Sequence, residues 1–232
     1  MPDTSVHPST GAAVTLGHVN LHYRRTEDGP AAARLLQILG LTLTQTLPLP
    51  NGSEFYRFTV NRDDPNRGDG IVYLGLLPEP LAALVDAVRE TLDVDGPNEH
   101  PAVAIARHGQ ARDPEQNFHV GLLVSSLDAI EERMAHLTQL AETDPAFKGR
   151  LKFLVNRAPP GDLEVDRRLD ASPLYRGVTR HTYGRNGVQA FVETDLVVGG
   201  PLADGLVFEL DYVFPGHEFH ILSVVELGAR RD

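Results

Sequence analysis

A short pattern that occurs twice constrains the fold of this chain more than any other feature. His18-Val19-Asn20-Leu21 is matched 101 residues later by His119-Val120-Gly121-Leu122. Asp69-Gly70-Ile71-Val72-Tyr73-Leu74 is matched 135 residues later by Asp204-Gly205-Leu206-Val207-Phe208-Glu209. An offset that grows along the chain is what an insertion inside the second copy produces. The sequence therefore predicts two copies of one structural unit.

Hydrophobic periodicity predicts that each unit consists of a strand, a helix and three further strands. In the first unit the predicted strands are 16–24, 41–49, 54–61 and 70–77, with a helix from Asp28 or Gly29 to Gly40. In the second unit they are 118–124, 150–155, 188–196 and 205–214, with a helix after Ser125 or Ser126. The predicted fold class is α+β, with two βαβββ modules that form a cup-shaped mixed sheet and helices outside.

The remaining segments divide the chain around these units. The predicted organisation is a mobile leader at 1–15, the first module with a connecting helix and linker at 16–116, and the second module at 117–232 with an insertion at 158–180. The connecting helix begins at Pro80 and carries an apolar face of Leu81, Leu84, Val85, Val88 and Leu92. The stretch 93–116 is rich in Pro, Gly and charge, and is predicted to be irregular apart from a short strand at 102–106. One further strand is predicted at 219–227.

Three of the predicted strands have one apolar face and carry polar residues on the other, read at the strand period of two. Along 205–214 the polar face holds Glu209 and Asp211. His119 lies on the polar face of 118–124, and that of 16–24 holds His18, Asn20 and His22. If one sheet holds all three strands, His18, His119 and Glu209 can meet at one point. Taken alone, each of them is explained by a solvated strand face, and it is the three together at matching repeat positions that point to a metal site.

Composition excludes several classes of function. The 232 residues carry a formal net charge of −11, which repels nucleic acid and anionic membranes. There is no apolar run long enough to cross a bilayer, and residues 1–15 lack the apolar region of a signal peptide. The chain has no cysteine, which excludes disulfides and thiolate chemistry and is typical of a cytoplasmic protein. A small-molecule substrate is therefore the expected partner, and a homodimer is compatible with the sequence.

The order βαβββ twice, with a His in each first strand and the segments 16–23 (LGHVNLHY), 35–41 (LLQILGL) and 203–210 (ADGLVFEL), resembles the vicinal oxygen chelate superfamily. This superfamily includes glyoxalases, bleomycin-resistance-type binding proteins and extradiol dioxygenases. The resemblance covers most of 16–214. It implies that the two modules wrap one metal, with ligands on the first and last strand of each module.

Carried over by position, the resemblance implies metal ligands at His18, His119 and Glu209. The position that corresponds to Glu209 in the first module is expected at Leu74, which is not a ligand. Two His and one carboxylate, with other positions left open, are typical of non-haem Fe(II) oxygenases. The expected cofactor is therefore Fe(II), with Mn(II), Zn(II) or Ni(II) as alternatives.

The resemblance also suggests residues around the metal. Arg180-His181-Thr182 resembles a His-Thr of ring-cleaving extradiol enzymes, which makes His181 the candidate catalytic residue. The Tyr that those enzymes carry on the following strand falls at Phe191 here, and this difference removes a phenolic hydrogen bond. The candidate substrate pocket consists of Asn20, His22, Phe191 and Asp211.

Two classes of function, and a variant of the first, follow from these residues. The first is an Fe(II)-dependent, dioxygenase-like oxidoreductase that acts on a small, oxygen-chelating substrate, aromatic compounds included. The second is a metal-free protein that binds a small molecule, as resistance proteins do. A glyoxalase-type lyase or isomerase that uses another divalent ion is the remaining alternative. The first needs an intact set of ligands, whereas the second needs only a cavity.

Overall fold

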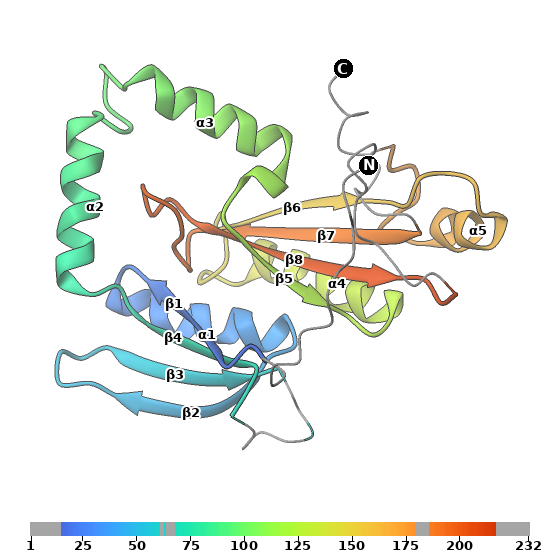
Figure 1. Cartoon of the computed structure of the whole chain (residues 1–232), viewed down its shortest axis with the longest axis horizontal. Helices are drawn as coiled ribbons and strands as arrows, with labels where there is room; N and C mark the ends of the chain where they lie inside the picture. The colour runs from blue at the N-terminus through green and yellow to red at the C-terminus, as the bar shows by residue number, and fades with distance from the viewer. Residues whose placement is uncertain (1–14, 61–62, 64–67, 180–185, 217–232) are drawn as a thin grey trace, which may run out of the picture.

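The computed structural model describes residues 15–60, 63, 68–179 and 186–216. Within these residues the chain forms two four-stranded mixed sheets, each with an associated helix (Figure 1). The strand predicted at 219–227 and the candidate catalytic residue His181 lie outside the described residues. The predicted division of the chain at residue 116 stays a prediction.

The first module has the strand order β1-β4-β3-β2. Its elements are β1 (His18–Tyr23), α1 (Gly29–Ile38), β2 (Thr42–Pro48), β3 (Glu54–Thr59) and β4 (Ile71–Leu76). β1 pairs in parallel with β4, and the other two pairings are antiparallel. The helix begins with Pro30 in its first turn, a position where the missing N–H is not needed.

The second module repeats this topology with the strand order β5-β8-β7-β6. Its elements are β5 (His119–Leu123), α4 (Leu127–Thr143), β6 (Leu151–Asn156), β7 (Gly187–Thr194) and β8 (Leu206–Val213). The hydroxyl of Ser126 accepts a hydrogen bond of 3.2 Å from the Ala129 N–H and so caps α4, as the sequence predicts. The insertion between β6 and β7 contains one further helix, α5 (Leu163–Ala171). The predicted α+β fold class with two βαβββ modules is confirmed.

The hydrogen bonding differs from the prediction of one shared sheet, because β1 and β5 are edge strands of two separate sheets. These two edges lie on the sides of the sheets that face each other (Figure 1). The link recorded between β1 and the second module is an isolated antiparallel bridge from His22 to Val198, in which the Val198 N–H donates to the His22 carbonyl at 2.8 Å. The two polar faces are therefore neighbours that do not form one continuous surface.

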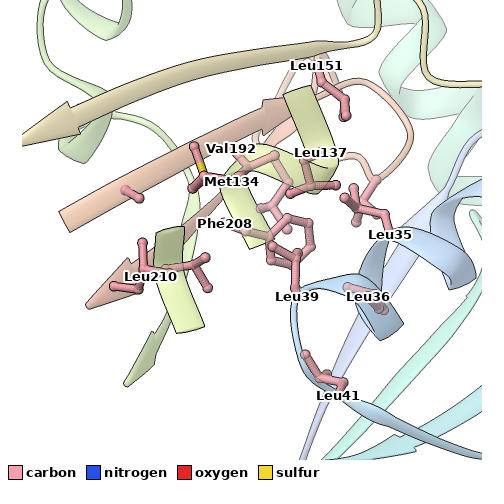
Figure 2. Packing of buried hydrophobic residues seen from close by; sticks show 14 of the residues in the cluster. Leu35, Leu36, Leu39, Leu41, Met134, Leu137, Leu151, Val192, Phe208 and Leu210 are labelled. Carbon is pink, nitrogen blue, oxygen red and sulfur yellow. The ribbon is translucent and has the colours of Figure 1, made fainter. Parts of the chain in front are cut away.

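One hydrophobic core joins the two modules on the helical side of the sheets. The apolar face predicted for β8 contributes Phe208 and Leu210, which are at most 1% exposed. Figure 2 shows these side chains together with Met134 and Leu137 of α4 and with Leu35, Leu36 and Leu39 from α1 and its C-terminal end. Burial of a large apolar side chain contributes about 1.5–3 kcal/mol. This shared core holds the modules together although their sheets are not hydrogen-bonded to each other.

Two helices connect the modules, and together we call them the α2–α3 arm. They are α2 (Glu79–Thr91) and α3 (Pro101–Arg112), followed by a short 3-10 turn, η2 (Pro114–Gln116). The predicted strand at 102–106 is wrong, because the chain is helical there: Pro101 occupies the first turn and the His100 ring accepts a hydrogen bond from the Ala102 N–H at 3.2 Å. α2 has no buried residue, so its predicted apolar face does not pack into the core. None of the described helices combines the length and hydropathy needed to cross a membrane.

Residue 205, directly before β8, has to be a glycine because of the backbone atoms that surround it. Its φ is +156°, and a Cβ atom at this position lies 2.5 Å from the carbonyl oxygen of Thr194. Because both groups belong to the backbone of paired strands, neither can move aside without disturbing the sheet. We expect Gly205→Ala to lower the free energy of unfolding by about 1–2 kcal/mol. Urea unfolding measures this loss, with Gly149→Ala as the control, because Gly149 also has a positive φ (+75°) but no atom within 4 Å of the added Cβ.

Candidate functional site

The polar face of the second sheet brings Glu209 and His119 together. In the parallel pair of β5 and β8, Glu209 lies opposite Gly121, and His119 lies opposite Val207. The two side chains thus come from adjacent rows of the same face, and at Gly121 the Asp211 carboxylate lies 3.6 Å from the position that a Cβ atom would take. The distance between Nε2 of His119 and Oε2 of Glu209 is 3.7 Å. The structure therefore places two of the three predicted metal ligands side by side.

Glu209 is a buried carboxyl group, with 6% of the residue exposed. Burial, followed by the negative charge of the neighbouring Asp211, raises the pKa of Glu209 to about 7. Burial also raises the pKa of Asp211, which lies two residues further along the same face. Among the described residues, the ion pair recorded for Glu209 is with His119 alone. A proton, a cation or a bound ligand must therefore offset this charge at neutral pH.

A chain of amide side chains holds Glu209 in place from the other side. Nε2 of Gln189 on β7 donates to a carboxylate oxygen of Glu209, and also to Oε1 of Glu115 at 2.8 Å. Oε1 of Gln189 in turn accepts from Nδ2 of Asn156 on β6 at 3.0 Å. Because the Gln189 amide is bonded at both its nitrogen and its oxygen, it fixes the orientation of the Glu209 carboxyl group before any ligand binds.

His119 is oriented by its other ring nitrogen. Nδ1 lies 3.0 Å from the carbonyl oxygen of Asn117, an acceptor, so the ring proton of the neutral imidazole is on Nδ1. Nε2 then presents its lone pair toward Glu209. The His119 side chain is 36% exposed, in contrast to the buried carboxyl group beside it. It therefore connects a buried titratable group to the solvent.

A cavity of about 470 Å³ lies beneath α3 on the same module, and neither His119 nor Glu209 is part of its lining. Its walls come from α3 (Arg107 among others), from Asn117 and Phe118, from the loop 199–205, and from Lys152 and Glu193 on the polar face of the sheet. Glu193 pairs with Val207, so the cavity borders the row of side chains that contains His119. Glu209 lies two residues further along β8, about 7 Å at the strand rise. Because neither Val207 nor Glu209 lines the cavity, a ligand has to extend beyond its walls along the polar face to reach Glu209.

His18 does not join His119 and Glu209. It lies on the first sheet, where its ring packs against Tyr73 with the ring centroids 5.3 Å apart. Within the described part of the chain, no three His, Asp or Glu side chains are grouped so that they could hold a metal ion. Of the three predicted ligands, the structure therefore brings together only the two that belong to the second module, His119 and Glu209.

The residue that corresponds to Glu209 in the first module is Tyr73, and the expectation of Leu74 is wrong. His18 pairs with Ile71 in the first sheet as His119 pairs with Val207 in the second. Two residues further along the last strand, the equivalent positions are Tyr73 and Glu209. Leu74 is fully buried in the core, so it belongs to the opposite face of β4.

The predicted substrate pocket is divided between the modules. Asn20 and His22 line a separate cavity on the first sheet. Phe191 is 1% exposed and pairs with Glu209, so it forms part of the packed floor rather than an open wall. Asp211 is half-buried beside Glu209. Its carboxyl group is hydrogen-bonded to that of Glu209, and its negative charge contributes to the raised pKa of Glu209.

Sequence reasoning missed Gln189, Glu115 and Lys152. Gln189 is a polar residue two positions from Phe191 in an apolar strand, and the strand period alone could have placed it on the polar face. Glu115 lies in η2, within the stretch that was predicted to be irregular. Nothing in the sequence pattern indicated that it reaches the sheet.

No family model matches the sequence, and no curated protein matches it. The fold is similar to that of solved structures in the glyoxalase/bleomycin resistance/dioxygenase group. A possible glyoxalase from Bacillus cereus is 16% identical, with 85% of this chain and 98% of that chain covered and a TM-score of 0.35. A glyoxalase/bleomycin resistance protein/dioxygenase family enzyme from Burkholderia phytofirmans PsJN is 12% identical, with 87% and 100% covered and a TM-score of 0.35. A glyoxalase/bleomycin resistance protein/dioxygenase from Nocardioides is 15% identical, with 93% of both chains covered and a TM-score of 0.32. At these identities the likeness concerns the fold alone, and the two-module fold of this chain rests on its own strand order.

Proposed function

We propose that this chain is a protein of the vicinal oxygen chelate type that binds a small organic molecule beneath α3 and exchanges a proton with it at Glu209. The observation that carries the proposal is a buried carboxyl group that faces one imidazole and the Asp211 carboxyl, and that has no Lys or Arg partner among the described residues. Such a group is held close to its titration point at neutral pH. It can therefore either take or give a proton there.

His119 completes the proton path. Glu209 is buried, so a proton that it takes from a ligand needs a route to water. The lone pair of His119 Nε2 lies 3.7 Å away on a side chain that is 36% exposed. The reaction class that fits this pair is proton abstraction next to a carbonyl group, the chemistry of a lyase or isomerase. The proton passes from the substrate carbon to Glu209, the electron pair of the broken C–H bond forms a C=C bond, and the π pair of the carbonyl group moves onto its oxygen.

The metal-dependent alternative is favoured by a different observation. The Nδ1–H of His119 donates to a backbone carbonyl, which is the arrangement that orients a metal-binding imidazole. As placed, however, the side chains do not fit an Fe(II) site with three protein ligands, because only His119 and Glu209 meet. The set of His18, His119 and Glu209, and with it dioxygenase activity, stays a prediction that requires His18 to approach the pair.

Hydrogen exchange on a simple substrate separates these proposals. The full chain is treated with a chelator and incubated in D2O with hydroxyacetone or dihydroxyacetone, and loss of the carbon-bound proton is followed by NMR. We expect exchange without metal, at a rate that rises with pH and levels off above about pH 7, because only the ionised Glu209 is a base.

A parallel set of samples is supplied with Fe(II) or Mn(II) and its metal content is measured for the wild type, His119→Ala and His18→Ala. One bound ion per chain that is lost in both variants, together with exchange that depends on that ion, overturns the metal-free proposal in favour of the metal enzyme. Absence of exchange in every sample overturns the proton-transfer proposal, and absence of bound metal as well overturns the metal enzyme and leaves the small-molecule-binding protein.

A further inference from the structure

The first module carries a cavity of its own. Its volume is about 480 Å³, within the range of small-molecule sites, and it shares no lining residue with the cavity beneath α3. It is bounded by the end of β1, by the turn between β2 and β3, and by the end of β4 with the first turn of α2. Much of the wall is apolar, from Leu49, Phe55, Leu76, Leu77, Pro78 and Ala82. The proton-transfer site of the second module makes no use of it.

An aromatic ring forms one wall of this cavity. The ring of Phe55 lies against the backbone of Gly75, where an added Cβ would come within 3.2 Å of it. It also packs against Tyr73 at 5.4 Å between ring centroids, with an angle of 33° between the ring planes. These contacts fix the ring while leaving Phe55 half-exposed toward the cavity. A fixed and partly open aromatic face favours a ligand with a planar ring.

His22 supplies a polar group that is held in place. Its Nε2 lies 3.1 Å from the Asn20 amide nitrogen, a donor, so Nε2 accepts and the ring proton is on Nδ1. Burial lowers the pKa of His22, and the ring is therefore neutral at neutral pH. The backbone of His22 is fixed by the hydrogen bond from Val198 described above. The site thus offers a neutral N–H donor on a rigid strand.

The charges around the cavity do not favour an anion. Arg24, its basic residue, is bound to the carboxylate of Asp86 on α2. The other charged residue of the lining is Glu79, which is exposed. The cavity therefore has no cation left to neutralise a carboxylate or phosphate group.

We propose that this cavity is a second ligand site, which binds a neutral aromatic molecule that carries a hydroxyl group or a ring nitrogen. The ring stacks on Phe55, and the oxygen or nitrogen atom accepts a hydrogen bond from Nδ1 of His22. This class of ligand matches the apolar walls, the paired Arg24 and the one neutral donor.

Fluorine NMR on the full chain tests the proposal, with 4-fluorophenol as the probe. We expect the probe signal to broaden in the presence of the protein, and Phe55→Leu and His22→Gln each to raise the dissociation constant about five- to ten-fold. Phe118→Leu is the matched control, because Phe118 is an aromatic residue that lines the other cavity. This variant and Glu209→Gln should bind the probe as the wild type does, so the result is independent of the proton-transfer proposal.

A charged probe tests the chemical class. 4-Fluorobenzoate has the same ring and a negative charge, and we expect it to bind at least ten-fold more weakly than 4-fluorophenol. The proposal is wrong if neither probe binds, if Phe118→Leu rather than Phe55→Leu removes binding, or if 4-fluorobenzoate binds as tightly as the phenol. A single cooperative thermal transition well above the temperature of the binding measurement establishes that each variant is folded.

Discussion

Asp28→Ala should lower the free energy of unfolding by about 3–5 kcal/mol, because it removes one partner of a buried ion pair between the modules. Asp28 is 3% exposed and precedes α1 of the first module. It binds Arg25 at 2.8 Å and also the guanidinium of Arg150, which precedes β6 of the second module. Burial alone raises the pKa of Asp28, but the hydrogen bonds from Arg150 and Arg25 outweigh this effect and hold the pKa below its ordinary value.

A matched control is available at the same arginine. Arg150 also pairs with Asp195, whose side chain is 53% exposed, so Asp195→Ala is expected to change stability by less than about 1 kcal/mol. Urea unfolding followed by far-UV circular dichroism measures both variants. Because the pKa of Asp28 is depressed in the folded state, its contribution is present at neutral pH and is lost as the pH falls through the acidic range. Equal losses for the two variants would contradict the role of Asp28 as a buried link between the modules.

The topology could be predicted from the sequence, because it depends on local periodicity. The two copies of the His-containing strand and the alternation along β8 determine which face of each strand is buried, and the core includes Phe208 and Leu210 as expected. The α2–α3 arm could not be predicted in the same way. Its apolar residues on α2 have the spacing of a packed helix, yet none of them is fully buried, and Leu81 and Leu84 are exposed.

The site could be predicted only in part, because the sequence repeat does not fix the register of the paired strands. The repeat correctly identified the strands, but a match of letters set Leu74 against Glu209, one residue away from the pairing of the strands. A slip of one residue exchanges the two faces of a strand, so this error turned a tyrosine on the polar face into a core leucine. The distance between His18 and the other two residues depends on how the modules pack, and that is decided by core contacts far apart in the sequence. The periodicity of single strands and helices carries no information on this distance.

Glu209→Gln tests both the charge and the chemistry of the site. A carboxyl group whose pKa is about 7 in the folded protein and near 4.5 when unfolded takes up a proton on folding. The free energy of unfolding of the wild type therefore falls as the pH rises from about 4.5 to about 7. Above about pH 7 this decrease is complete. The shift corresponds to roughly 3 kcal/mol, which coupling to Asp211 and partial solvent screening reduce to about 2 kcal/mol.

Glutamine keeps the shape of the side chain and its hydrogen bond with an amide partner, but has no charge to bury. We expect Glu209→Gln to be more stable than the wild type by about 2 kcal/mol at pH 8 and equal to it near pH 4.5, as measured by urea unfolding across this range. Glu193→Gln, on the same face of the sheet with a side chain that is 42% exposed, should leave the pH profile unchanged.

The same variant should lose its chemistry while it gains stability. Without an ionisable group at position 209, the deuterium exchange of hydroxyacetone is expected to fall by about 10²-fold or more, and its inflection near pH 7 should disappear. A variant that is merely misfolded would lose stability and activity together, so an opposite change in the two quantities identifies Glu209 as the proton-transfer group. If Glu209→Gln exchanges at the rate of the wild type, the carboxyl group is a structural feature of the sheet. In that case the cavity beneath α3 serves binding alone.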